Sequence, residues 1–313
     1  MLPLKEKLKS LLPLLCGYLG YILWGFSNKV ISTALGCIEE LPGSVLLSHR
    51  FVVSCIIMLV LVATRLVKVN FRNKKWGSAA LLVTFQFAYY LFETATTRAT
   101  NSSVSSLVSA VSPVLAIVLA AIFLKEYPST RQKLFCILPV AGVILMVVAG
   151  AGEDMKVITS VTPVILLTMA IFTSGAYRTI NRSASRYFTA FERTLILFIF
   201  SSVANTILAL GELDWNVDAY IAPLKIPTYL YSMLFLSVVC SLVCNLLVNY
   251  ATANLPVVKI SSLGALTTVV GVLVGLLTGD PWNPMFLVGS VLIVVGIWQV
   301  TKVPKVKEES TTK

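Results

Sequence analysis

The chain has 313 residues, of which 57% are hydrophobic and only 12% are charged, and its mean hydropathy is +0.87. Soluble domains are roughly 45–50% apolar and about 25% charged, so this composition excludes a water-soluble fold. Apolar stretches of about 20 residues, long enough to cross a hydrocarbon layer of about 30 Å, fill most of the space between the charge clusters. We therefore predict an all-α integral membrane protein built as one bundle.

The net charge of +11 does not indicate nucleic-acid binding, because the basic residues form short clusters between apolar stretches, as topology signals do. The six cysteines lie almost entirely in apolar stretches, and His49 is the one histidine. This pattern predicts no metal, cofactor or disulfide framework. The basic N-terminus resembles a signal peptide, but the apolar run continues to about Ala34 without a cleavage motif, so a retained first helix is expected.

Charge clusters and Pro, Gly and Asn breaks divide the chain into ten predicted transmembrane helices. In chain order they cover residues 11–34, 42–66, 77–97, 103–124, 132–150, 158–180, 188–210, 227–250, 256–278 and 284–301. Membrane strands are not indicated, because alternation with a period of two is absent and the apolar runs are too long.

The charges also predict the orientation of these helices. Most of the 25 Lys and Arg residues fall in every second connection, whereas the connections between these carry mainly acidic residues. Because cytoplasmic loops are enriched in Lys and Arg, we expect both termini in the cytoplasm and a multi-pass protein of the cytoplasmic membrane.

The two halves of the sequence resemble each other. A shift of 154 positions places Ala99 on Ala253, Glu126 on Asp280 and Gly142 on Gly296. The segment after the fourth helix is basic and its counterpart after the ninth has no basic residue, as expected if the second half is inserted upside down. We predict two inverted five-helix repeats, residues 1–152 and residues 153–313 with a short basic cytoplasmic tail, an arrangement typical of secondary transporters.

The stretch at 102–147, SSVSSLVSAVSPVLAIVLAAIFLKEYPSTRQKLFCILPVAGVILMV, resembles the first-repeat signature of the drug/metabolite transporter superfamily, EamA type. The resemblance rests on a small-residue helix with Pro113, a helix end at Glu126 and a glycine-containing helix. The second repeat departs from the pattern, with Thr267 and Asp280 at the matching positions. The resemblance implies a ten-helix fold with a central cavity that carries small organic solutes, often outward, but the fold does not select among them.

Ionisable groups inside the hydrocarbon are costly and are candidates for function. Lys29, Arg50 and Glu93 are expected at similar depth in the outer half of the membrane, with His49 close by. Arg50 or Lys29 could bind a carboxylate or phosphate of the substrate, and Glu93 an amine or a proton. The alternative is an ion pair that locks the outer gate or the helix packing. Proton coupling through His49 is disfavoured by the neighbouring Arg50.

Two further groups of residues are assigned to the bundle interior. Cavity lining, or else hydrogen bonding between helices, is expected of Trp24, Asn28, Tyr89, Tyr90, Asn245 and Asn249. Helix packing is expected of Ser105, Ser109, Ser112, Gly264, Thr268, Gly271 and Gly275. Glu192 and Arg193 are placed at the membrane interface, and Glu126 and Asp280 are expected to cap the helices that follow them.

No phosphate-binding loop, HExxH motif or acid–base constellation is found, so neither an ATP-driven pump nor an enzyme is indicated. The favoured function is secondary transport of a small organic solute, such as an amino acid or another metabolite, by alternating access and in the direction of export. Alternatives are an organic-phosphate or nucleotide-sugar exchanger, and a receptor or assembly protein that does not transport. The expected partners are the solute, the lipid bilayer and, as a further candidate, protons; a monomer is compatible with the sequence, and no nucleic acid is expected.

Overall fold

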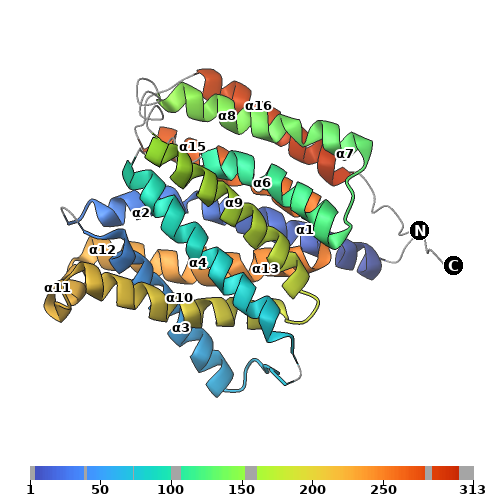
Figure 1. Cartoon of the computed structure of the whole chain (residues 1–313). Helices are drawn as coiled ribbons and strands as arrows, with labels where there is room; N and C mark the ends of the chain where they lie inside the picture. Colours follow the sequence, from blue (N-terminus) through green and yellow to red (C-terminus); the bar gives the residue numbers. More distant parts are fainter. Residues whose placement is uncertain are drawn as a thin grey trace.

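A computed structural model describes residues 4–38, 41–72, 74–99, 107–151, 161–278 and 284–302, and all regular elements in these ranges are helices (Figure 1). The first half holds α1 (Leu4–Gly25), α2 (Ser27–Leu35), α3 (Gly43–Ala63), α4 (Trp76–Ala99), α6 (Leu107–Leu119), η1 (Ala120–Leu124), α7 (Thr130–Phe135) and α8 (Ile137–Ala151). The second half holds α9 (Val161–Ala184), α10 (Ala190–Glu212), α11 (Val217–Ile221), η3 (Ala222–Lys225), α12 (Pro227–Phe235), η4 (Leu236–Val243), α13 (Cys244–Asn254), α14 (Val257–Leu263), α15 (Leu266–Leu277) and α16 (Pro284–Lys302). The predicted all-α class is confirmed.

Several of these helices are long and apolar enough to cross a membrane. Among the described residues, four segments qualify by length and composition: Leu11–Leu35, Gly43–Ala63, Ala190–Glu212 and Pro227–Asn254. Shorter apolar helices cover Trp76–Phe92, Ser112–Leu124, Val257–Gly271 and Leu287–Val300. Helical structure is present within each of the ten predicted spans, while the number of membrane crossings and the side of the termini stay predictions.

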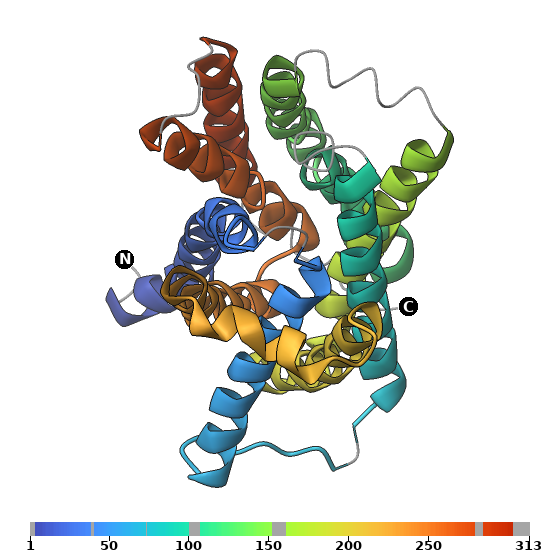
Figure 2. The ribbon, with the colours of Figure 1, turned by 90° about the vertical axis from the view of Figure 1, so that its left-hand side faces the viewer.

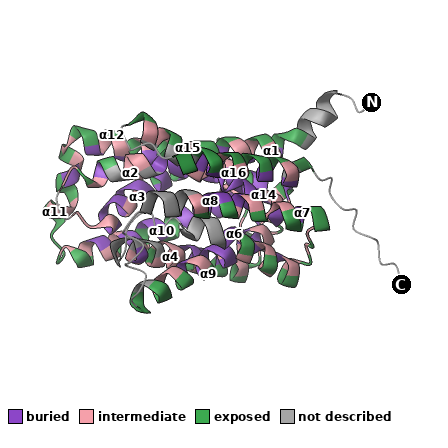
Figure 3. Cartoon of the chain, turned by 90° about the horizontal axis from the view of Figure 1, so that it is seen from above, coloured by how far each residue is buried: buried purple, intermediate pink, exposed green. Residues whose placement is uncertain are grey.

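The surface is apolar and much of the interior is polar. Large hydrophobic side chains project outward, among them Leu277 at 87% exposure and Phe123 at 72%, which in water would be a liability but suits contact with lipid. The buried positions include hydroxyl and charged side chains such as Ser48, Arg193 and Ser241 (Figure 3). The interior of the bundle is therefore where polar chemistry is available.

The helix contacts follow a two-fold pattern. Extensive contacts join α3 to α10, α4 to α9, α8 to α16 and α1 to α13, and further contacts join α6 to α9 and α1 to α15 (Figures 1 and 2). If each predicted span is exchanged for its counterpart in the other half, α4·α9 becomes α13·α1 and α6·α9 becomes α15·α1. The pairs α3·α10 and α8·α16 map onto themselves. Two repeats related by a two-fold axis would make this set of contacts.

The contact between α8 and α16 has the same reciprocity at the level of residues. A Cβ on Gly142 would lie 2.8 Å from the Ile293 side chain and 2.5 Å from the carbonyl oxygen of Gly289. A Cβ on Gly296 would meet the Pro139 ring, and Pro139 is the residue that the 154-position shift places on Ile293. Each glycine thus lets the two helices approach closely at equivalent points. The exact division between residues 152 and 153 stays a prediction.

Substitution of Gly142 by alanine should destabilise the bundle, because the new methyl group would meet backbone of α16 that has no room to move. Overpacking of this kind costs roughly 1–3 kcal/mol. We expect Gly142→Ala to lower the thermal unfolding temperature of the detergent-purified protein by several degrees.

The matched control is Gly77→Ala, since a Cβ at Gly77 meets no atom within 4 Å. Equal unfolding temperatures for the two variants would contradict the close α8·α16 contact.

Candidate functional site

Arg50 places a cation inside the bundle, on the buried face of α3. Its side chain is 4% exposed, its Nε donates a hydrogen bond to Oγ of Ser241 in η4, and its guanidinium carbon lies 5.7 Å from the centroid of the Phe51 ring. Among the described residues, the Arg50 side chain makes this one hydrogen bond, to Ser241, although a guanidinium has five N–H donors. Arg50 therefore keeps capacity to bind a further acceptor.

His49 lies in a hydrogen-bonded group between α3 and α12. Its Nδ1 is 2.9 Å from the Tyr229 hydroxyl, and its ring centroid is 4.5 Å from that of Tyr220. The Tyr220 hydroxyl lies 2.7 Å from Oγ of Ser48. Nε2 of His49 is buried without a hydrogen-bond partner in the described part of the chain. These aromatic partners could not be predicted from the sequence.

Two further hydrogen bonds join α3 to α10. Ser48 Oγ lies 2.6 Å from Oγ1 of Thr206, and Ser44 donates to Glu212 Oε2 at 2.6 Å. These bonds hold the Gly43 end of α3 against the C-terminal half of α10.

A second polar cluster surrounds Arg193 near the start of α10. Arg193 is fully buried and donates to the backbone oxygens of Asn181 at 2.9 Å and Asn249 at 2.6 Å, and also to Oδ1 of Asn181. Asn249 accepts from Asn181 Nδ2 at 2.8 Å and donates to Thr194 Oγ1 at 2.8 Å. Arg193 therefore joins α9, α10 and α13 inside the bundle, and its depth in the membrane stays a prediction. The interior location could not be read from the sequence because Arg193 is close to a helix end.

Arg182 and Glu126 form a bridge between the two halves of the chain. Arg182 Nε donates to Glu126 Oε1 at 2.9 Å, and Nη1 donates to the carbonyl oxygens of Thr252 at 2.9 Å and Ala253 at 2.5 Å. Glu126 Oε2 accepts from the backbone N–H of Val257 at 2.9 Å. This bridge gathers the end of η1, the end of α9, the C-terminus of α13 and the N-terminus of α14.

Glu126 was expected to cap the helix that follows it, and this is wrong. Ser129 caps α7 instead, in a reciprocal capping box with Gln132. Glu126 caps α14, which lies far away in the sequence, so its role depends on the tertiary fold. Asp280 lies outside the described residues.

The predicted cavity-lining residues divide into two groups. The ring centroids of Trp24 and Tyr21 lie 6.0 Å apart. Those of Tyr89 and Tyr90 lie 5.2 Å apart, and that of Tyr90 lies 5.7 Å from that of Phe51. Asn245 donates to the Ser241 carbonyl at 2.8 Å within its own helical segment, and Asn249 bonds to neighbouring helices. Of these two amides only Asn249 makes interhelical hydrogen bonds, and cavity lining stays a prediction for both.

For several predicted residues the structure does not describe the side-chain contacts that would test the prediction. Lys29 is partly buried in α2, so a meeting of Lys29, Arg50 and Glu93 stays a prediction. The surroundings of Asn28, Glu93, Ser109 and Gly275 are not described, and Ser105 lies in the undescribed segment 100–106.

The structure describes the surroundings of four further residues expected to pack between helices: Ser112, Gly264, Thr268 and Gly271. A Cβ on Gly271 would be 3.6 Å from the Gly25 carbonyl oxygen, and one on Gly264 would be 3.1 Å from that of Ser261. Thr268 is partly buried, while Ser112 is fully buried and its Oγ has no partner among the described residues. Gly264 also makes room for a charged side chain, because its Cβ would lie 3.2 Å from Nη1 of Arg178.

The Arg193 cluster should be structural, so its disruption should prevent folding. Replacement by Lys keeps the charge but removes the planar fork that reaches two helices. Loss of partners for a buried charge costs about 3–5 kcal/mol. We expect Arg193→Lys to give little monodisperse protein in gel filtration, whereas Arg186→Lys, at an exposed position beyond α9, should behave as the unaltered chain. Normal yield and unfolding temperature for Arg193→Lys would refute this assignment.

Comparison with known proteins adds an independent line to this geometry. A solved crystal structure superposes on the chain with a TM-score of 0.74, covering 92% of this chain and 96% of that chain at 14% sequence identity, which supports the fold. The curated protein "Uncharacterized transporter YcxC" of Bacillus subtilis (strain 168) is 26% identical over 288 residues, covering 90% of this chain and 91% of that protein.

The profile of the EamA-like transporter family matches the chain twice, over residues 11–148 and 161–302. The two matches fall on the two halves whose helix contacts follow the two-fold pattern. The chain belongs to the EamA-like transporter family, within the drug/metabolite transporter superfamily.

Proposed function

We propose that this membrane transporter works by alternating access and exports a small organic solute, an amino acid or another metabolite, across the cytoplasmic membrane. The observation that carries the proposal is the two-fold pattern of helix contacts, because two similar halves can exchange roles and open a central site to one side and then to the other. Oppositely inserted repeats would provide this exchange.

The Arg182–Glu126 bridge supports the same mechanism. It joins the first half, through Glu126, to the second half, through Arg182 and the N-terminus of α14. A second ion pair between the halves, Lys74 Nζ to Glu192 Oε2 at 2.6 Å, lies where α10 begins. In the predicted orientation both pairs are at the cytoplasmic end, so we assign them to a closed inner gate. Asp280, the counterpart of Glu126 in the repeat, provides a carboxylate for a gate at the opposite end.

Arg50 is the proposed binding or gating residue at the centre of the bundle. Its unused donors and the neighbouring Tyr90 suit a solute with a carboxylate or phosphate group, since a cation in a medium of low dielectric attracts such groups strongly. Lys29, Glu93 and His49 are proposed as its partners on the outer side. An organic-phosphate or nucleotide-sugar exchanger, and a receptor or assembly protein without transport activity, are the alternatives.

Counterflow uptake in liposomes tests this function. Liposomes that contain the purified chain are preloaded in turn with an unlabelled amino acid, an organic phosphate, a nucleotide sugar or a cationic dye. They should take up the labelled form of one class in a saturable manner. Arg50→Ala should reduce the uptake at least tenfold, because the anion would lose its cation. The matched control is Arg72→Ala, at an exposed loop position.

Saturable uptake that is unchanged in Arg50→Ala would remove Arg50 from the substrate path. Absence of uptake for all four classes by correctly folded protein would favour the alternative without transport.

Charge reversal at the Arg182–Glu126 bridge tests the gate. Glu126→Arg and Arg182→Glu each place two like charges where an ion pair now lies, so each should slow counterflow several-fold. The double variant restores opposite charges and should regain part of the rate. If the effects of the two single variants simply add in the double variant, the bridge is not a coupled element of the gate.

A further inference from the structure

Arg178 in α9 is a cation with few partners. Among the described residues, the Arg178 side chain makes one hydrogen bond, and it is long: 3.4 Å from Nη1 to the Tyr21 hydroxyl. Its Nε is buried and has no partner in the same part of the chain. Arg182, one turn further along α9, donates three hydrogen bonds. Buried donors are rarely left unsatisfied in native proteins, and inside a membrane a guanidinium is especially costly. The unsatisfied donors of Arg178 therefore require an explanation, whereas Arg182 is accounted for by its hydrogen bonds.

No carboxylate neutralises Arg178 in the described part of the chain. Glu126 pairs with Arg182 and Glu192 pairs with Lys74, and both of these carboxylates are committed to helix N-termini. The nearby ionisable groups are hydroxyls: Tyr21, to which Arg178 donates, and Tyr177, which lies within electrostatic range of both Arg178 and Arg193. Among the described residues, neither of these two ion-paired carboxylates balances the charge of Arg178.

The end of the Arg178 side chain packs against the backbone at Gly264. α14 and α15 are interrupted at Gly264 and Ala265, which form a turn, and a Cβ on Gly264 would lie 3.2 Å from Nη1 and 3.6 Å from Nη2 of Arg178. The same point is 3.1 Å from the carbonyl oxygen of Ser261, whose Oγ is buried and without a partner among the described residues. A second donor that lacks an acceptor therefore lies on the element that faces Arg178.

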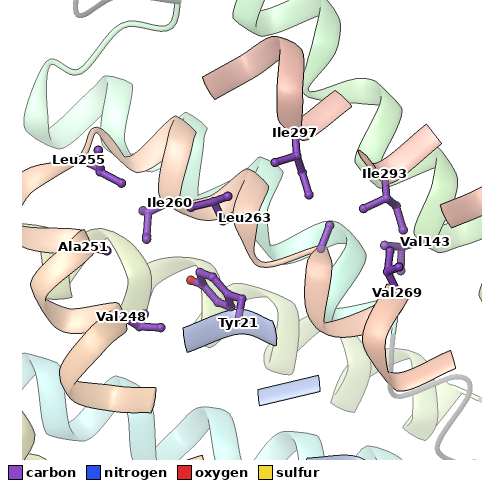
Figure 4. Close-up of a cluster of buried hydrophobic side chains, with 11 residues drawn as sticks. Tyr21, Val143, Val248, Ala251, Leu255, Ile260, Leu263, Val269, Ile293 and Ile297 are labelled. Atoms are coloured by element: carbon purple, nitrogen blue, oxygen red, sulfur yellow. The ribbon is translucent and has the colours of Figure 1, made fainter. Parts of the chain in front are cut away.

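The helices α6, α9 and α14 contact one another pairwise. Each of them carries a buried polar atom without a partner in the described residues: Ser112 Oγ, Arg178 Nε and Ser261 Oγ. On the other side α1 contributes Tyr21, whose ring packs among apolar residues of α13 and α14, including Val248 and Leu263 (Figure 4). The polar groups of Arg178 and Tyr21 therefore lie next to apolar side chains.

We propose that Arg178, Tyr21 and Ser261 bind the anionic group, carboxylate or phosphate, of an organic solute. A carboxylate or phosphate has several acceptor lone pairs and would satisfy the guanidinium and the hydroxyls together, while the apolar side chains of α13 and α14 contact the rest of the solute. This inference rests on the proposed transport function and deepens it by a second binding position for the anionic group of the solute, at Arg178 in α9 and separate from Arg50.

Binding of small anions to the full-length chain in detergent tests the proposal without any transport step. The probes are succinate and inorganic phosphate, with uncharged succinamide as the matched control. Trp24, whose ring is 6.0 Å from that of Tyr21, reports binding by fluorescence, and subtraction of the signal of Trp24→Phe isolates its contribution. We expect saturable quenching by succinate or phosphate and none by succinamide.

Arg178→Gln should weaken this binding at least tenfold, whereas Arg186→Gln, an exposed arginine just beyond the same helix, should leave it unchanged. If Arg178→Gln does not fold, Tyr21→Phe removes one hydroxyl and should weaken binding about threefold, and Gly264→Ala should weaken it by placing a methyl group against the guanidinium. Absence of saturable anion binding, or equal affinity in the Arg178 or Tyr21 variants and the parent, overturns the proposal. Anion binding at Arg178 without counterflow would refute the proposed transport function but not the anion site. Counterflow without anion binding at Arg178 would refute the anion site but not the transport function.

Discussion

Hydrocarbon supplies no hydrogen bonds, so each polar group inside the bundle must be satisfied by the protein itself or by what the protein binds. Arg193 shows this constraint most fully: the guanidinium is completely buried and draws backbone oxygens of Asn181 and Asn249 toward it. These bonds determine how α9, α10 and α13 meet. Arg178, less than one helical turn before Asn181 on α9, lacks such partners, and it is this contrast that separates a structural cation from one available to a ligand.

The two-fold pattern of helix contacts relates the fold to the proposed transport mechanism. Glycines at equivalent positions, Gly142 and Gly296, allow α8 and α16 to approach closely, and irregular turns at η1, η4 and the α14–α15 junction interrupt the regular helical ladder. Such π-helical segments and breaks are common at functional sites. Arg50 bonds to one of them, η4, and Arg178 lies against another. The candidate sites thus occur where the helices depart from regularity.

The helices, their apolar outer faces and the internal repeat could be predicted because hydropathy, charge and self-similarity are local or periodic signals. The partners of individual polar residues could not. The bonds of Arg193 to α9 and α13 could not be predicted, because hydropathy does not tell which face of a helix is buried. Glu126 was assigned to the next helix because the N-terminus it caps, at Val257, is remote in sequence. Asn249 was correctly recognised as interior, with its bonding pattern left open.

The central claim is that the two halves are inserted in opposite orientations, and the connections after α3 and after α10 test it most directly. They are equivalent in the repeat, and Arg72 and Asp218 lie exposed within them. Single cysteines at these positions, in a chain whose six native cysteines are replaced, can be labelled in intact cells and in inverted vesicles with a membrane-impermeant maleimide. The account predicts that position 218 reacts in cells and position 72 only in inverted vesicles; reaction of both positions from the same side would contradict it.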